Sequence, residues 1–396
     1  PFLNKIINLE QNVPHLTLYY VLALADTIGS YLFAYKISVM TADQKEYIQV
    51  RISMVFNVVK VLLQIVLLIW LKSYGIYLVL SLIATVGSNI VASIKAEKEY
   101  PYIKEKRGLE KEKKRDIFDT IRSVFLYKIS NVILTGTDNT LISALVGTVY
   151  VGYYSNYFLL ENSLYVIMKI VFRSTTASVG NLVVTEDAKT RYRVFDYMQT
   201  ISFCMCAVVI PCYFVLVDDF ISHVWLGKGF GIGLFALIGL CLNFYITSVF
   251  LPVISFREAI GLYRKTKYYM LAAALLNVGL SAIFSIKWGM AGILLATPIA
   301  RLLTYVWYEP KILFEEYFEK GAGQFIVQCI KNVFLVTGIS WLCYIIGTHI
   351  LVSGIIGWIL KGCLCGSLSL IITICAYRKT EGFQWLVGQA KKGLNM

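Results

Sequence analysis

The chain has 396 residues, of which 58% are hydrophobic and 15% are charged, and its formal net charge is +13. Soluble domains contain about 45–50% apolar and about 25% charged residues, so this composition excludes a soluble enzyme and also a disordered chain. In so apolar a chain, the excess of basic residues indicates membrane topology rather than nucleic-acid binding. We therefore expect an all-α polytopic protein of the cytoplasmic membrane with no nucleic-acid partner.

The N-terminal part contains three stretches long enough to cross a bilayer, because a spanning helix needs about 20 mostly apolar residues. They lie at 15–36, 50–71 and 75–94. Residues 1–14 precede them and are expected outside the cell. A chain that enters its first span from outside usually has earlier spans, so we expect an N-terminal truncation, and three missing helices would give fourteen in all.

A charged segment follows at 95–120, with the sequence KAEKEYPYIKEKRGLEKEKKRDIFDT. One interpretation is a binding surface for anionic lipid headgroups or for a cytoplasmic partner. The other is a solvated connector between two helix bundles, since charges of both signs are mixed. We favour the connector and place the main domain boundary here.

Eight further apolar stretches bring the predicted number of spans to eleven. They lie at 123–147, 150–172, 197–217, 232–255, 268–286, 290–308, 328–347 and 355–377. Basic residues are concentrated between alternate spans, at 45–51, 95–115, 189–193, 257–267, 311–320 and 378–392. The opposite side carries little beyond Lys5, Lys72, Lys228 and Lys287. By the positive-inside rule, the 95–120 segment and the C-terminus are cytoplasmic.

Ionisable residues within the predicted spans are candidates for a functional site, because each costs about 2.5–3.5 kcal/mol to insert on translocon scales. Lys60 and Arg301 lie centrally in their spans. Each either lines an aqueous cavity or forms a structural ion pair, and we predict that both face one cavity. The planar guanidinium of Arg301 suits phosphate recognition.

Two carboxylates, Asp138 and Glu161, occur on consecutive predicted helices. They either pair structurally with Lys128, Lys169 or Arg173, or titrate and couple transport to an ion. Tyrosines are dense between 150 and 165, near Asn156. Most aromatic residues of a membrane protein form interfacial belts, but tyrosine beside asparagine also suits a sugar-binding cavity.

Five short motifs occur in an order and spacing that carry a resemblance. They are Ala42-Asp43-Gln44-Lys45-x-Tyr47, Thr137-Asp138-Asn139-x-x-Ile142-Ser143, Val151-Gly152-x-Tyr154-Ser155-Asn156-Tyr157, Phe256-Arg257-Glu258-Ala259-x-Gly261-Leu262 and Gly289-x-x-Gly292-Ile293-Leu294-x-Ala296-Thr297. Over roughly residues 15–375, the chain resembles polysaccharide-biosynthesis (O-antigen or capsular repeat-unit) flippases of the multidrug/oligosaccharidyl-lipid/polysaccharide exporter superfamily.

The resemblance implies transport, without a cofactor and without enzymatic chemistry, of undecaprenyl-pyrophosphate-linked oligosaccharides by alternating access. It implies two six-helix lobes with two extra helices, divided here into 1–94, a connector at 95–120, a lobe at 121–310 and extra helices at 311–396. Polysaccharide polymerase and glycosyltransferases are the expected protein partners. The expected substrate-cavity residues are Lys60, Arg301, Asp138, Asn139, Asn156, Tyr157 and Glu161, with Asp138 and Glu161 as candidates for ion coupling.

Two alternative functions stay open. A cation-coupled multidrug antiporter of the same superfamily would need acidic rather than basic cavity residues. A membrane polysaccharide polymerase or ligase would need a large external catalytic loop, and the external stretch at 217–231 holds only Asp218, Asp219 and His223 as candidates. We interpret the two aspartates as helix-ending residues. The nine cysteines contain no C-x-x-C pair, so no metal site is expected.

Overall fold

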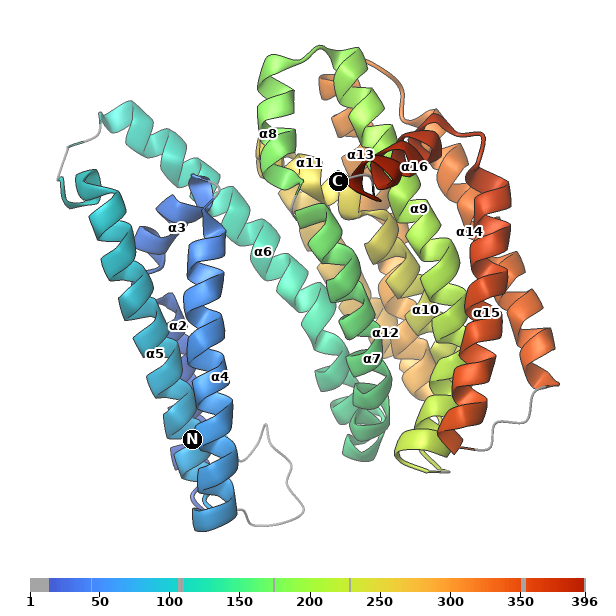
Figure 1. The fold of residues 1–396 in the computed structure, drawn as a ribbon, viewed down its shortest axis with the longest axis horizontal. Helices are drawn as coiled ribbons and strands as arrows, with labels where there is room; N and C mark the ends of the chain where they lie inside the picture. The colour runs from blue at the N-terminus through green and yellow to red at the C-terminus, as the bar shows by residue number, and fades with distance from the viewer. Residues whose placement is uncertain are drawn as a thin grey trace. The chain divides into compact units, whose positions relative to one another are not determined.

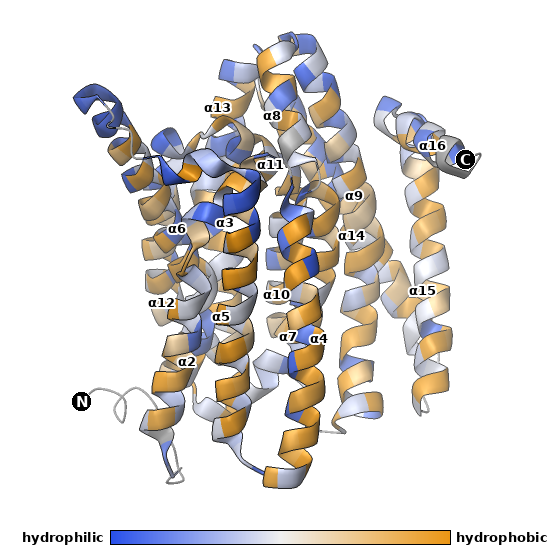
Figure 2. Ribbon diagram, turned by 60° about the vertical axis from the view of Figure 1, so that its left-hand side comes forward, coloured by the Kyte–Doolittle hydropathy of each residue, from blue (hydrophilic) through white to orange (hydrophobic). Residues whose placement is uncertain are grey.

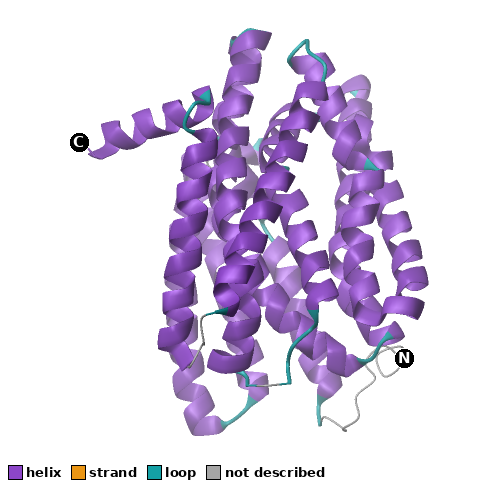
Figure 3. Cartoon of the chain, turned by 90° about the vertical axis from the view of Figure 1, so that its right-hand side faces the viewer, coloured by secondary structure: helices purple, strands orange, loops and turns teal. Residues whose placement is uncertain are grey.

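The computed structural model describes residues 14–43, 45–105, 108, 110–173, 175–227, 229–349 and 354–394. About 90% of it is helix, and the described residues contain no strand, as expected for an all-α protein (Figure 3). Four basic residues used for the topology, Lys5, Lys106, Arg107 and Lys228, lie outside these ranges.

The chain forms two compact units, and the break between them falls after Glu110 (Figure 1). This break lies inside the charged 95–120 segment. Much of that segment is helical, since one helix runs to Glu99 and the next begins at Lys111. Lysine and glutamate are good helix formers, so the segment extends the neighbouring helices.

The first unit is a small helical group. Its elements are α2 (Leu16–Tyr31), α3 (Ala34–Ala42), α4 (Glu46–Leu71), α5 (Tyr74–Glu99) and the 3₁₀ helix η1 (Pro101–Lys104). The span expected at 15–36 is bent by 45° between α2 and α3, because Phe33 adopts a left-handed conformation with φ 66°. The Asn89 side chain donates to the carbonyl oxygens of Gly29 and Ser30, at 3.1 and 3.2 Å, and so satisfies acceptors near the end of α2.

The second unit holds the larger core. Its elements are α6 (Lys111–Leu145), α7 (Thr148–Arg173), α8 (Thr176–Thr185), α9 (Ala188–Asp219), the π-helix η2 (Phe220–Trp225), α10 (Leu234–Val249), α11 (Leu251–Ile260), α12 (Tyr263–Leu303), α13 (Tyr305–Tyr317), α14 (Gly323–Thr348), α15 (Gly354–Tyr377) and α16 (Glu381–Leu394). Helix α9 packs against α7, α10, α14, α15 and α16. Fully buried aromatic residues such as Phe195, Phe244 and Phe314 fill the core around it.

Helix α12 folds back on itself at Gly289, whose φ of 54° and ψ of −133° are open only to glycine. The Asn277 amide donates to the Thr297 hydroxyl across the hairpin at 2.7 Å. At Gly292, a Cβ atom would lie 2.3 Å from the carbonyl oxygen of Phe284, so the two arms approach too closely for any other residue. The two stretches predicted at 268–286 and 290–308 thus correspond to two antiparallel helical segments.

In the part of the chain that the structure describes, six helices are long and apolar enough to cross a membrane, or eight if each bent helix pair is one span. The protein is therefore a multi-pass membrane protein, and Figure 2 shows long apolar stretches along α4 and α15. Helices α6 and α7 fall outside this group of described helices because of polar residues such as Asp138 and Glu161. The arrangement of eleven spans in two six-helix lobes stays a prediction.

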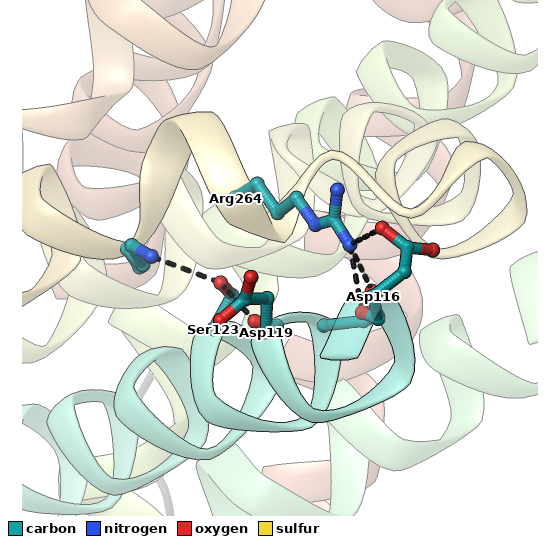
Figure 4. Close-up of polar contacts among 6 residues, drawn as sticks. Asp116, Asp119, Ser123 and Arg264 are labelled. Atoms are coloured by element: carbon teal, nitrogen blue, oxygen red, sulfur yellow. Dashed lines mark hydrogen bonds and ion pairs between the residues drawn. The ribbon is translucent and has the colours of Figure 1, made fainter. Parts of the chain in front are cut away.

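The charged first half of α6 is fixed to the start of α12. Arg264 donates to the Asp116 carboxylate and to the Thr120 hydroxyl, and Lys267 donates to Ser123 at 2.9 Å (Figure 4). Because α6 is continuous from Lys111 to Leu145, these contacts set the position of its polar inner half as well.

Candidate functional site

A cavity of about 390 Å³ lies in the second unit between α6, α7, α10, α11, α12 and α13. Its charged lining residues are Lys128, Lys169, Arg257, Arg301, Asp138, Glu161 and Glu258. Its tyrosines and amides are Tyr127, Tyr154, Tyr165, Tyr305, Asn131, Asn162 and Asn243. Few aliphatic side chains reach it, so the cavity offers charges, hydroxyl groups and aromatic faces within an otherwise apolar bundle.

Three residues predicted from the sequence line this cavity together, namely Asp138 on α6, Glu161 on α7 and Arg301 on the second arm of α12. Each is more than nine-tenths buried, with exposed fractions of 6%, 5% and 4%. The guanidinium of Arg301 thus shares one buried cavity with both carboxylates. Buried charges of opposite sign compensate one another's loss of water, which stabilises such a group inside a membrane protein.

Asp138 belongs to a hydrogen-bonded chain that reaches across the α12 hairpin. The Thr297 hydroxyl donates to an Asp138 carboxylate oxygen at 3.1 Å and accepts from the Asn277 amide at 2.7 Å. Among the described residues, no ion pair is seen between Asp138 or Glu161 and Lys128 or Lys169, so of the two interpretations the structure gives no support to pairing with these lysines. A neutral hydroxyl and the more distant Arg301 take that place.

Two groups in the cavity keep hydrogen-bonding capacity for a ligand. Arg301 donates through Nη1 to the Tyr305 hydroxyl at 2.7 Å, while its buried Nε has no acceptor. Glu161 Oε2 is likewise buried without a donor. A buried polar atom without a partner costs about 1–3 kcal/mol, so these atoms favour a bound ligand, ion or water that would satisfy them.

Arg257 is a cavity residue that sequence reasoning missed, because its position was assigned to a cytoplasmic loop. The structure buries it in α11, where Nη1 lies 3.0 Å from a Glu309 carboxylate oxygen of α13. The Tyr127 hydroxyl donates to the other oxygen at 2.9 Å, and the Arg257 guanidinium lies 4.5 Å from the Tyr127 ring centre. The sequence signal for this pair is weak, because Glu258 directly follows Arg257 and Lys311 lies two residues after Glu309.

Three predicted cavity residues lie elsewhere. Asn139 is exposed on α6, one position around the helix from Asp138. Asn156 donates to the Gly152 carbonyl oxygen of its own helix at 2.8 Å. Tyr157 is buried outside the cavity, where its hydroxyl bonds to the Asp218 carboxylate. The amides that reach the cavity are Asn131, Asn162 and Asn243 instead.

Lys60 belongs to the first unit, where it is half-buried on α4 and donates to the Asn57 side chain at 2.9 Å. Glu46, Gln49, Ser53, Asn57 and Lys60 recur every three or four residues and therefore form one polar stripe along the helix. The prediction that Lys60 and Arg301 line one cavity stays a prediction.

The aspartates of the predicted external stretch have tertiary partners. Helix α9 ends at Asp219, whose carboxylate pairs with Lys361 of α15 at 2.6 Å. Asp218 binds Tyr157, as described above. Lys361 is buried in an otherwise apolar helix, and sequence reasoning did not identify it.

Comparisons with protein-family models, with curated proteins and with solved structures found no match for this chain. Its function is therefore inferred from the cavity. Buried arginines suit phosphate groups, tyrosine faces and amides suit sugar rings, and a carboxylate beside them suits a proton or a small cation.

Proposed function

We propose that the protein moves undecaprenyl-pyrophosphate-linked oligosaccharides across the cytoplasmic membrane by alternating access. A headgroup with a pyrophosphate and several sugars cannot cross hydrocarbon unaided, because its charges and hydroxyl groups would lose their hydration. The observation that carries the proposal is a polar cavity with two buried arginines, Arg257 and Arg301, inside a membrane protein.

The two arginines would bind the pyrophosphate. In each, the buried Nε has no acceptor, whereas Nη1 is held by Glu309 or by Tyr305. These contacts orient both guanidinium groups before a ligand arrives, which lowers the entropy lost on binding. Phosphate oxygens would accept from the free N–H groups in short, charge-assisted hydrogen bonds.

The uncharged lining would hold the adjacent sugars. Tyrosine rings provide faces for the apolar side of a pyranose, and the three amides both donate and accept hydrogen bonds. A volume of about 390 Å³ falls in the range of roughly 300–1,000 Å³ that is usual for ligand sites. The cavity would therefore hold the first part of the headgroup, with the lipid tail left in the bilayer.

Glu161, with Asp138, would couple this movement to an ion. Both carboxylates share the cavity with Arg301. A proton or cation on Glu161 would therefore make the net charge of the cavity more positive, and this would strengthen the attraction of phosphate to Arg301. The C-terminus would lie in the cytoplasm, where glycosyltransferases assemble the substrate, and a polymerase would use the exported units.

Deletion of the gene tests the proposal. Lipid-linked repeat units should accumulate on the cytoplasmic face, and the wild-type gene should restore export. Arg301→Gln should fail to restore it at equal expression, whereas Asn139→Ala, which changes an exposed residue of α6 outside the cavity, should succeed. Normal export in the deletion strain would disprove the proposal.

A cation-coupled small-molecule antiporter is the second candidate, favoured by three carboxylates in the cavity, Asp138, Glu161 and Glu258. Drug susceptibility of the same deletion strain separates the two. An antiporter predicts sensitivity to cationic drugs that Glu161→Gln fails to relieve, with glycan export unchanged.

A further inference from the structure

We propose that α16 (Glu381–Leu394) lies in the membrane–water interface and that its basic flank binds the headgroups of anionic phospholipids. The proposal concerns a surface outside the cavity and does not rest on the proposed transport function. Helix α16 follows α15, a candidate span, and lies across its end instead of continuing its direction (Figures 2 and 3).

The contacts of α16 fix its depth relative to α9. The Trp385 ring stacks on the Tyr197 ring with centres 5.2 Å apart, and Gly382 approaches Thr200 so closely that a Cβ atom would lie 2.5 Å from the hydroxyl oxygen. In α9, the charged residues Lys189, Arg191, Arg193 and Asp196 all precede Tyr197, and none follows before Asp218. Helix α16 therefore docks where α9 changes from charged to apolar sequence, which is the level of the bilayer surface.

The sequence of α16 is amphipathic about this docking contact. Phe383, Leu386 and Val387 share one face by their spacing of three and four residues. Gln384 and Lys391 border that face next to Val387, and Glu381 lies opposite to it. The three apolar side chains are partly exposed. The docking contact on α9 uses Gly382 and Trp385, which lie on the flank away from Gln384 and Lys391. It therefore leaves part of the apolar face open to acyl chains and the polar border open to water.

The positive charge of the basic residues around α16 favours lipids with anionic headgroups. Arg378 and Lys379 are exposed in the turn between α15 and α16, and Lys391 is exposed near the end of α16. Glu381 is the acidic residue of this segment. Basic residues beside an interfacial helix attract anionic headgroups, and each one strengthens binding several-fold at moderate salt.

Lipid retention by the full-length protein tests the proposal. Purified protein is titrated with phosphatidylglycerol and, separately, with phosphatidylcholine in detergent, and bound lipid is counted by native mass spectrometry. The triple variant Arg378→Gln, Lys379→Gln, Lys391→Gln should bind phosphatidylglycerol at least about tenfold more weakly, with phosphatidylcholine unaffected. A charge-matched control is Arg122→Gln, Lys287→Gln, Lys311→Gln, which changes exposed residues of α6, α12 and α13 in the same unit. An equal loss in this control, or no loss in the first variant, would overturn the proposal.

Fluorescence quenching provides a second test of the position of α16. In vesicles containing brominated phosphatidylglycerol, the fluorescence lost on Trp385→Phe should be a component that the brominated lipid quenches. If aqueous iodide quenches that component and the brominated lipid does not, α16 projects into water and the proposal fails. A dimer in light scattering that the Trp385→Phe variant dissociates would also overturn it, because a second copy would then cover the helix.

Discussion

At the scale of single residues, the cavity holds two arginines, each with one guanidinium nitrogen bound to a protein group and another nitrogen without an acceptor. Tyr305 fixes one nitrogen of Arg301 and Glu309 fixes one of Arg257, while the Nε atoms of both arginines stay without an acceptor. An arginine held in this way presents a fork of fixed orientation, which a lysine cannot reproduce.

Arg301→Lys therefore tests geometry separately from charge. The positive charge is kept, but the fork and the contact with Tyr305 are lost, so we expect export to fall about tenfold, which corresponds to one strong charged hydrogen bond. The measurement is the rate of glycan export in the complemented deletion strain. Wild-type rates would show that charge alone matters.

Glu161→Gln separates coupling from binding. The amide keeps the shape of the side chain but can neither bind a proton nor attract a cation, so ion-driven accumulation should be lost. Exchange of substrate between equal pools should persist in the same proteoliposomes, because it needs no driving ion. Loss of both activities would instead indicate a role in binding or folding.

For the buried ion pair Arg257–Glu309, we expect removal of one charge to destabilise the protein more than removal of both. Glu309→Leu alone leaves a buried guanidinium without its partner, which costs about 3–5 kcal/mol. The double variant Arg257→Met, Glu309→Leu removes both charges and should recover most of that loss. Thermal unfolding in detergent measures both, and a double variant as unstable as the sum of the single variants would contradict an energetic coupling.

At the scale of helices, the sequence predicted where helices lie better than it predicted which side chains face the cavity. Asn139, Asn156 and Tyr157 share motifs with Asp138 and with the tyrosine cluster, which is why the sequence predicts them in the cavity. Motif membership carries no information on helix face. The spacing from Asp138 back to Thr135 and Asn131 does carry it, and these residues line the cavity together.

Backbone breaks were less predictable than helices. The bend at Phe33 has no local sequence signal, because an aromatic residue in a left-handed conformation is held there by its surroundings. Arg257 was assigned to a loop because local sequence does not show its partner. That partner, Glu309, lies 52 residues away in the sequence.

The hairpin of α12 gives a prediction with an internal control. Gly292→Ala would place a methyl group against the backbone of Phe284, so we expect a loss of stability of at least about 1–3 kcal/mol. Gly279→Ala changes the same helix where a Cβ atom meets nothing within 4 Å, and it should be neutral or slightly stabilising. Melting temperatures in detergent compare the two, and equal effects would argue against the close approach.

At the scale of the whole molecule, one helix from each unit marks the extremes of burial among the six candidate spans that the structure describes. In the apolar window of α4, 6% of residues are buried, whereas the window that begins in α9 reaches 56%. The sequence predicted a boundary within 95–120 from charge alone, and the chain divides there. It did not predict the difference in burial, because both units are equally apolar and burial depends on which helices meet.

Hydrogen exchange should report this difference. In detergent, amides of α4 should exchange faster than those of the inner half of α9, because opening of an element costs less where fewer side chains are buried. Mass spectrometry of peptides from both helices makes the comparison. Equal protection would mean that α4 is stabilised by contacts beyond its own unit.

The helices α15 and α16 are together attached to α9 at two places, by Lys361–Asp219 in α15 and by Trp385 on Tyr197 in α16. Because two separate contacts join them, α15 and α16 cannot rotate relative to α9. Any rocking that opens the cavity would therefore move α9, α15 and α16 as one body, and the backbone would bend outside that body at glycines with positive φ such as Gly261 and Gly289. The C-terminal helices would then act as the fixed frame against which the cavity walls move.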